Sequence, residues 1–197
     1  MGVGQFAMSF AGPVDQYFAA GLGPGMVATL GYANRIVALG MTLGATVISR
    51  STLTIFAEGI NTGEAKRIQR GALNWAAAMG LLGALAALLL WLTAHGLVTL
   101  LFERGAFTSA DTNSVAETLR VGIWQLPFFM SGMVLVSFLA GARRYRDISL
   151  IAMTIIVCKC GGNYFLSLSF GLPGVMFASV AMYAMSAALC WVAVGKI

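Results

Sequence analysis

Charged residues are scarce in this sequence of 197 residues. Lys, Arg, Asp and Glu together make up 10% of the chain, whereas hydrophobic residues make up 59% and the mean hydropathy is +0.85. A typical soluble domain is about 25% charged. A water-soluble fold of this size could not bury so much apolar side chain, so the composition indicates an integral membrane protein. A helix of roughly 20 apolar residues crosses a bilayer, and the chain has room for about six.

Residues that commonly carry catalysis or bind metals are also scarce. The chain has three cysteines, too few for a disulfide framework, and a single histidine, His95. The sequence shows no zinc-ligand set, Ser/His/Asp arrangement, phosphate-binding loop or haem motif. We therefore expect no enzymatic activity, cofactor or metal ion. The net charge of +5 is explained better by membrane topology than by an acidic partner, and we expect no nucleic acid as a partner.

Apolar runs separated by Gly/Pro turns and polar connections predict an all-α membrane fold of six helices. Proline lacks an N–H group and glycine tolerates left-handed backbone angles, so both residues end helices. We expect residues 95–118 to form an interfacial hairpin, in which Thr108 and Asp111 make a capping box. The expected helices cover residues 3–21, 26–56, 71–94, 119–141, 148–169 and the stretch after the turn at 171–174.

Positive charge is unevenly distributed between the two ends of these predicted helices. One end carries Arg104 and Arg120. The other end carries most of the basic residues: Arg50, Lys66, Arg67, Arg70, Arg143, Arg144, Arg146 and Lys196. Membrane proteins keep their Lys- and Arg-rich loops in the cytoplasm. The distribution thus predicts a multi-pass protein with both termini in the cytoplasm.

Three ionisable residues fall inside the predicted spans, namely Asp15, Arg35 and Lys159. Each costs at least about 2.5–3.5 kcal/mol at a helix centre, and such residues normally face a partner or a cavity. A turn of five residues joins the helices that carry Asp15 and Arg35, so the two side chains could meet. Their contact would then be either a structural ion pair or part of a substrate site.

Lys159 lies near the predicted midplane and is followed by Gly161, Gly162 and Asn163. Three interpretations stay open, because its ammonium could reach toward the interface, pair with Asp15 or face a hydrated cavity. In the last case Arg35 and Lys159 together would make the cavity cationic. A cationic cavity suits an anionic substrate such as a diphosphate.

Two motifs resemble the MurJ (MviN) family of lipid II flippases. The first lies within residues 14–35, where Val-Asp is followed by a turn of small residues and then by Leu-Gly-Tyr-Ala-Asn-Arg. The second lies within residues 101–112, which begin Leu-Phe-Glu-Arg-Gly-Ala-Phe-Thr and continue to an acidic residue. The resemblance runs from about residue 12 to the end of the chain.

This resemblance implies a flippase fold of two six-helix lobes around a central cavity. Residues 1–197 would form one lobe, the second, so the expected partners are the lipid bilayer and another six-helix lobe or subunit. The implied function is alternating-access transport of an anionic, diphosphate-linked lipid saccharide across the bacterial inner membrane. Arg35 matches an arginine of the family's cationic cavity, and Asn34 matches a position that is acidic in some members. Lys159 matches no family motif.

The candidate substrate-binding residues are thus Arg35, Lys159, Asn34 and Asp15, with Asp15 orienting Arg35 or competing with the substrate for it. Residues 49–56 lack the family's usual Leu-Pro, and residues 143–149 lack its Asp followed by Thr-Pro. These departures indicate a divergent branch. They keep open three alternatives: a polysaccharide-precursor or drug exporter, a non-transporting membrane subunit, and a truncated flippase remnant.

Overall fold

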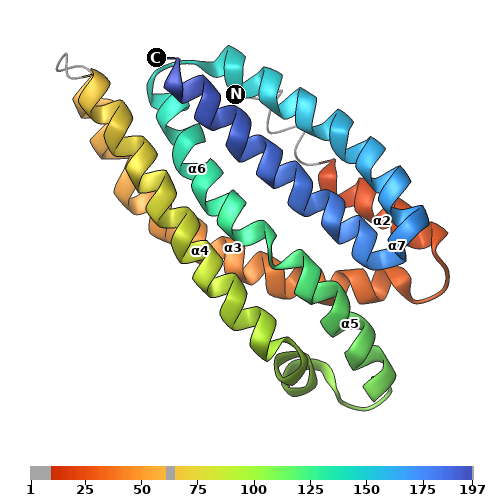
Figure 1. Ribbon diagram of the computed structural model, residues 1–197. Helices are drawn as coiled ribbons and strands as arrows, with labels where there is room; N and C mark the ends of the chain where they lie inside the picture. Colours follow the sequence, from red (N-terminus) through yellow and green to blue (C-terminus); the bar gives the residue numbers. More distant parts are fainter. Residues whose placement is uncertain (1–9, 61–64, 197) are drawn as a thin grey trace.

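A computed structural model describes the backbone of residues 10–60 and 65–196, and the side chains of these residues outside 49–65. The described backbone is almost entirely helical and contains no strand. Figure 1 shows the helices arranged as a bundle. They are α2 (Ala11–Gly21), α3 (Met26–Ile60), α4 (Ala65–Phe102), α5 (Ser109–Gly122), α6 (Gln125–Gly141) and α7 (Tyr145–Gly195).

Helix α7 makes two passes, because its 51 residues reverse direction at Gly171. The backbone there has φ 60° and ψ −136°, a conformation open essentially to glycine alone. The two halves of α7 run back antiparallel in Figure 1, drawn in light and dark blue. With α5 and α6 counted as one segment, the described chain has six helical segments, as many as the sequence predicted, although α2 is only 11 residues long. Four stretches are long and apolar enough to cross a bilayer: Met26–Ile48, Lys66–Phe102, Ser109–Gly141 and Tyr145–Gly195.

The third helix does not end near residue 94 as predicted, and the hairpin expected at 95–118 consists of the end of α4, a turn and the start of α5. Helix α4 continues through this stretch to Phe102, and α5 begins at Ser109 after a short turn. Gly96 alone does not end α4, because one glycine costs only about 1 kcal/mol inside a helix. The predicted capping box is confirmed: the Asp111 carboxylate accepts from the Thr108 backbone N–H at 2.8 Å, and the Thr108 side chain accepts from the Asp111 N–H.

The helix predicted at 119–141 is broken between Gly122 and Gln125. The Trp124 N–H donates to the Val121 carbonyl at 3.3 Å, which is a tighter turn than an α-helix makes. Pro127 follows, and a proline can neither donate a backbone hydrogen bond nor fit against the preceding turn of a helix. The break starts α6 at Gln125, in the interior of the bundle, where this side chain is buried.

Two hydrophobic clusters hold the bundle together, one on each side of this break. The first surrounds α5 and includes Leu30, Val98, Val115, Leu119 and Ile123. The second surrounds α6 and includes Ile48, Ala76, Val134, Leu135 and Phe138. Other large apolar side chains point outward, among them Leu81, Leu85, Leu88 and Leu92 of α4. An outward row of leucines is what a lipid-facing helix presents.

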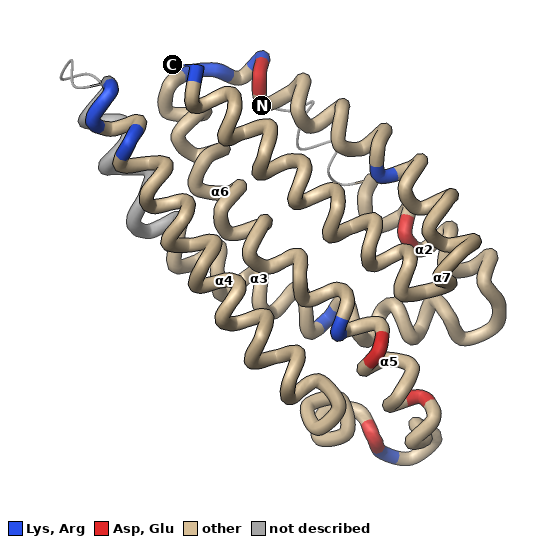
Figure 2. Tube along the Cα trace, viewed as in Figure 1, with Lys and Arg blue, Asp and Glu red and all other residues tan. Residues whose placement is uncertain are grey.

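Basic residues gather at the end of the bundle where α4 begins, α6 ends and the C-terminus lies (Figure 2). Arg104 lies at the opposite end, in the turn between α4 and α5. The side chain of Arg50 is outside the described residues. The uneven distribution predicted from the sequence is thus present along the bundle axis.

Helix α4 crosses the kinked start of α6 at Gly83. A Cβ atom at this position would lie 2.8 Å from Pro127 Cα, so only glycine fits without displacement of backbone. We expect Gly83→Ala to lower the free energy of unfolding by about 1–3 kcal/mol, as overpacking does. Gly96→Ala on the same helix is the matched control, since no heavy atom lies within 4 Å of its Cβ position. Thermal unfolding in detergent micelles measures both, and equal midpoints would contradict the close approach.

Candidate polar site

The buried charges Asp15 and Lys159 form an ion pair between α2 and the first half of α7. Lys159 Nζ lies 2.9 Å from Asp15 Oδ1 and donates a hydrogen bond to Asp15 Oδ2, also at 2.9 Å. Only 7% of Asp15 and 2% of Lys159 is exposed. Of the three interpretations given for Lys159, pairing with Asp15 is the one the structure shows.

Two neutral side chains complete the pair. Asn163 Nδ2 donates to Asp15 Oδ1 at 2.8 Å, and Ser179 Oγ donates to Asp15 Oδ2 at 3.1 Å. Lys159 also donates to Ser179 Oγ. Lys159 and Asn163 share one face of α7 because residues four apart on a helix are neighbours. Ser179 reaches them from the returning half of α7. The Lys159 ammonium thus lies close to three oxygens and donates hydrogen bonds to two of them, Asp15 Oδ2 and Ser179 Oγ.

The predicted contact between Asp15 and Arg35 is wrong. Arg35 is exposed on α3, and its guanidinium lies 5.3 Å from the ring centre of Tyr32. No carboxylate of the described residues forms an ion pair with it. The prediction assumed that α2 turns its acidic face toward the helix that follows it in the chain. Instead α2 packs mainly against α7, so Asp15 meets Lys159.

A cavity of about 200 Å³ lies beside the ion pair. Of the predicted site residues, Asp15, Lys159 and Asn34 line it together, and Arg35 does not. Its other polar lining residues are Gln125, Ser179 and Tyr183. Its apolar lining residues are Ala11, Gly12, Val37, Ala38, Met41 and Met182. Lys159 lines this cavity while paired with Asp15, so the cavity is balanced in charge and is not the cationic one expected from Arg35 and Lys159 together.

Gln125, Ser179 and Tyr183 were missed by reasoning from the sequence. For Ser179 a signal existed, because it is a polar residue in the apolar stretch that returns after the turn at Gly171, beside the stretch that carries Lys159. Gln125 is a polar residue in an otherwise apolar run, but its direction depends on the helix break beside it. Tyr183 carries no signal that separates it from an ordinary core aromatic residue.

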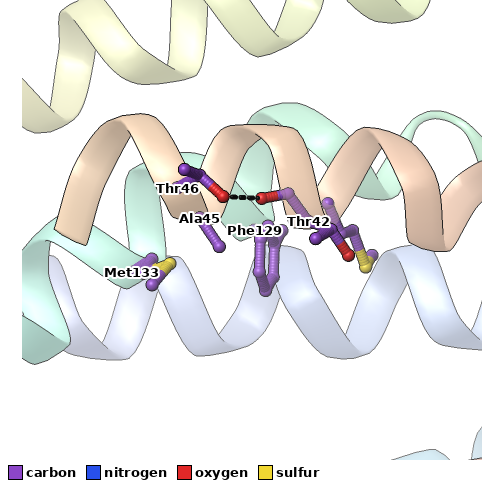
Figure 3. Close-up of a pocket in the computed structure, with 6 residues that line it drawn as sticks. Thr42, Ala45, Thr46, Phe129 and Met133 are labelled. Carbon is purple, nitrogen blue, oxygen red and sulfur yellow. Dashed lines mark hydrogen bonds between the residues drawn. The ribbon is translucent and has the colours of Figure 1, made fainter. Parts of the chain in front are cut away.

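A second hollow adjoins the cavity at Met41 and lies between α3 and α6. It is a groove of about 310 Å³ lined by Met41, Thr42, Ala45, Thr46, Phe129 and Met133 (Figure 3). Thr42 donates its hydroxyl proton to the Ala38 carbonyl at 2.7 Å, and Thr46 donates to the Thr42 carbonyl at 2.8 Å. With these protons used inside α3, the groove offers walls suited to an apolar group rather than to a charged one.

Comparison with known proteins identifies the fold and the family. The family model described as "Lipid II flippase MurJ" matches residues 1–197. The chain belongs to the MurJ family. A probable lipid II flippase MurJ of Bdellovibrio bacteriovorus is 25% identical in an alignment of 196 residues that covers 95% of this chain and 36% of that protein. The resemblance seen in the two sequence motifs is thereby confirmed.

Solved structures agree with this assignment. MurJ in an inward closed conformation superposes with a TM-score of 0.85 at 18% identity, over 98% of this chain and 41% of that one. A MOP superfamily transporter from Pyrococcus furiosus, for which the reverse polarity of its binding pocket suggests a different function, gives 0.72 at 19% identity, over 95% of this chain and 41% of that one. An outward-facing multidrug resistance MATE family transporter superposes with a TM-score of 0.69 at 18% identity, over 98% of this chain and 43% of that one. These likenesses show the fold, and the chain spans about two fifths of the MurJ proteins that it matches.

The MurJ family and the apolar helices together make this chain a multi-pass membrane protein. Among its described residues, no group of three His, Cys, Asp or Glu side chains could hold a metal ion. What the site presents is one balanced pair of buried charges beside a polar cavity and, on the adjacent face of α3, one arginine without an acidic partner among the described residues.

Proposed function

We propose that this chain is one lobe of a transporter that moves a lipid-linked oligosaccharide of the lipid II type across the bacterial inner membrane by alternating access. The support is the family match over the whole chain and the function named for the B. bacteriovorus relative. Because the chain spans 36% of that relative, we propose a second six-helix lobe or subunit as its partner. The two lobes together would enclose the substrate.

The observation that best supports this proposal is the environment of Arg35. Its guanidinium is exposed on α3, its neighbour is the Tyr32 ring, and no carboxylate of the described residues occupies its donors. A guanidinium presents a planar set of donors that matches phosphate oxygens. Lys159, by contrast, already has Asp15 as its counter-ion. We therefore assign the diphosphate contact to Arg35, and a supporting role to Asp15 and Lys159 in shaping the cavity that Asn34 also lines.

The distribution of basic residues along the bundle supports one orientation of this chain in the membrane. The basic end carries Lys66, Arg67 and Arg70 at the start of α4, and Lys196 near the end of the chain. We propose that this end faces the cytoplasm, since cytoplasmic loops are enriched in Lys and Arg. The proposed transport consists of substrate binding and release alone, without covalent chemistry.

A second candidate function is a non-transporting membrane subunit. The observation that favours it is the Asp15–Lys159 pair, in which both buried charges serve helix packing. In this case Arg35 would contact a partner helix or lipid phosphate rather than a transported substrate. The two candidates make different predictions for Arg35.

Complementation separates them. In a bacterium depleted of its own MurJ, we would express this chain alone and with the first lobe of a MurJ relative. Each pairing would carry Arg35, Arg35→Lys or Arg35→Ala. We expect rescue only with the added lobe, and a transport rate about 10–100-fold lower for Arg35→Ala, since hydrogen bonds to charged groups contribute about 1.5–3 kcal/mol.

The control is Arg146→Ala, at the basic end of the bundle and away from the cavity. Membrane levels of all variants are compared by blotting. Equal rescue by Arg35 and Arg35→Ala would assign this residue to structure and favour the non-transporting subunit.

A further inference from the structure

The cavity beside Lys159 is electrically balanced. The Lys159 ammonium donates to Asp15 Oδ2 and to the Ser179 hydroxyl and lies 2.9 Å from Asp15 Oδ1. An anion entering here would have to displace Asp15 and leave that buried carboxylate without its partner. The cavity therefore disfavours a phosphate and favours a neutral polar group.

Gln125 is a buried lining residue that uses little of its hydrogen-bonding capacity. It is 5% exposed, and its Nε2 donates to Met176 Sδ at 3.7 Å. A thioether sulfur is a weak acceptor. The Gln125 carbonyl oxygen accepts no hydrogen bond from the described residues. A buried amide normally has partners on both its donor and its acceptor side, so this side chain is prepared for a ligand that both donates and accepts.

The remaining walls combine hydrogen-bonding and apolar surfaces. Asn34 and Tyr183 add donors and acceptors, while Val37, Met41 and Met182 add apolar contacts. A sugar ring has the same combination, with hydroxyl groups around its edge and C–H groups on its faces. The volume of about 200 Å³ corresponds to about seven waters at about 30 Å³ each. That is room for one ring and not for a longer saccharide.

We propose that this cavity is a binding site for a single neutral sugar ring of the transported molecule. The proposal rests on the proposed function, because it assumes that a phosphate-linked saccharide is the substrate. Asn34 of the cavity and Arg35 of the exposed α3 face are consecutive residues, so a ring in the cavity and a phosphate at Arg35 can belong to one molecule. Gln125 is the specificity-determining residue of this site, since its amide pairs with hydroxyl or acetamido groups.

Saturation-transfer NMR with the 197-residue chain in phosphatidylglycerol nanodiscs tests this site. The probe is methyl N-acetyl-β-D-glucosaminide. We expect a transfer signal with the unmodified chain and a signal lower by at least about fivefold with Gln125→Leu, as the loss of a buried hydrogen bond predicts. Gln16→Leu is the matched control, because Gln16 is exposed on α2. The sugar signal should not change between low and high NaCl, since salt screens charges and the probe has none.

Ala38→Phe is a second variant that leaves Gln125 intact. Ala38 lines the cavity and is exposed on α3, so a phenyl ring there closes the cavity without entering the packed core. We expect it to abolish the sugar signal, whereas Ala20→Phe on the exposed face of α2 should not. Circular dichroism verifies the helix content of each variant.

Pyrophosphate binding, followed by ³¹P NMR, separates this proposal from the transport proposal. Pyrophosphate binding should depend on Arg35 and not on Gln125. A chain that binds pyrophosphate through Arg35 but gives no sugar signal, or gives equal sugar signals with and without Gln125, would overturn the sugar site alone. Pyrophosphate binding unchanged by Arg35→Ala would count against the transport proposal and leave the sugar result to stand by itself.

Discussion

Replacing Lys159 with methionine is expected to lower the free energy of unfolding by about 3–5 kcal/mol, because removing one partner leaves a buried charge uncompensated. The charge left behind is Asp15, which would retain only the neutral donors Asn163 and Ser179. Methionine keeps the length and apolar stem of the side chain, so cavity formation contributes little. Thermal and denaturant unfolding in detergent micelles, followed by circular dichroism, measures the loss.

The double variant Asp15→Asn with Lys159→Met identifies the cause. If the loss comes from the unpaired carboxylate, the double variant should recover most of it, because neutral replacements of a buried ion pair are often close to neutral in stability. Lys196→Met is the control, since Lys196 is exposed at the end of α7. Additive losses from the two single changes would refute a direct interaction between Asp15 and Lys159, because contacting residues are expected to couple.

Replacing Gly174 with alanine is expected to have a comparably large effect. A Cβ atom at this position would collide with the carbonyl group of Leu166 in the other half of α7, and would also lie 3.2 Å from Phe170 Cβ. The obstacle is backbone, which cannot rotate away as a flexible side chain can. We therefore expect a loss at or above the upper end of the 1–3 kcal/mol range of overpacking, about 3 kcal/mol or more. Unfolding in detergent micelles, or failure of the variant to accumulate in membranes, would register it.

Gly161→Ala on the first half of α7 is the matched control. No heavy atom lies within 4 Å of its Cβ position, and alanine is the better helix former by about 1 kcal/mol. This variant should be as stable as the unmodified chain or slightly more stable. If Gly161→Ala and Gly174→Ala behaved alike, the tight reversal of α7 would not be the reason for glycine at position 174.

The number and class of the helices could be predicted from the sequence because lipid imposes a simple rule. Every backbone polar group in a bilayer must be hydrogen-bonded within the protein, and an apolar helix of roughly 20 residues does this while it crosses the lipid. The turn at Gly171 and the cap at Thr108 were predictable for a similar reason. Each depends on residues within one turn of chain, and no distant partner is involved.

The partner of Asp15 could not be predicted, because that choice depends on packing. The sequence places Asp15 on a helix directly joined to the helix of Arg35, and chain proximity favoured that pair. Which helix α2 leans against depends on the complementary surfaces of α2, α3 and α7, and no local pattern encodes it. The break before Gln125 was missed for a related reason: Pro127 was visible, but an apolar run with one proline also fits an unbroken, bent helix.

The order in which the chain is synthesised determines when the Asp15–Lys159 pair can form. These residues are 144 positions apart, so at roughly 5–20 residues per second the ribosome delivers Lys159 on the order of ten seconds after Asp15. During that interval Asp15 has no lysine to neutralise it, and α2 has no α7 to pack against. The packing of α2 against α7 can therefore form only after the hairpin at Gly171 has been made, whereas α2 can pack against α3 as soon as α3 is present.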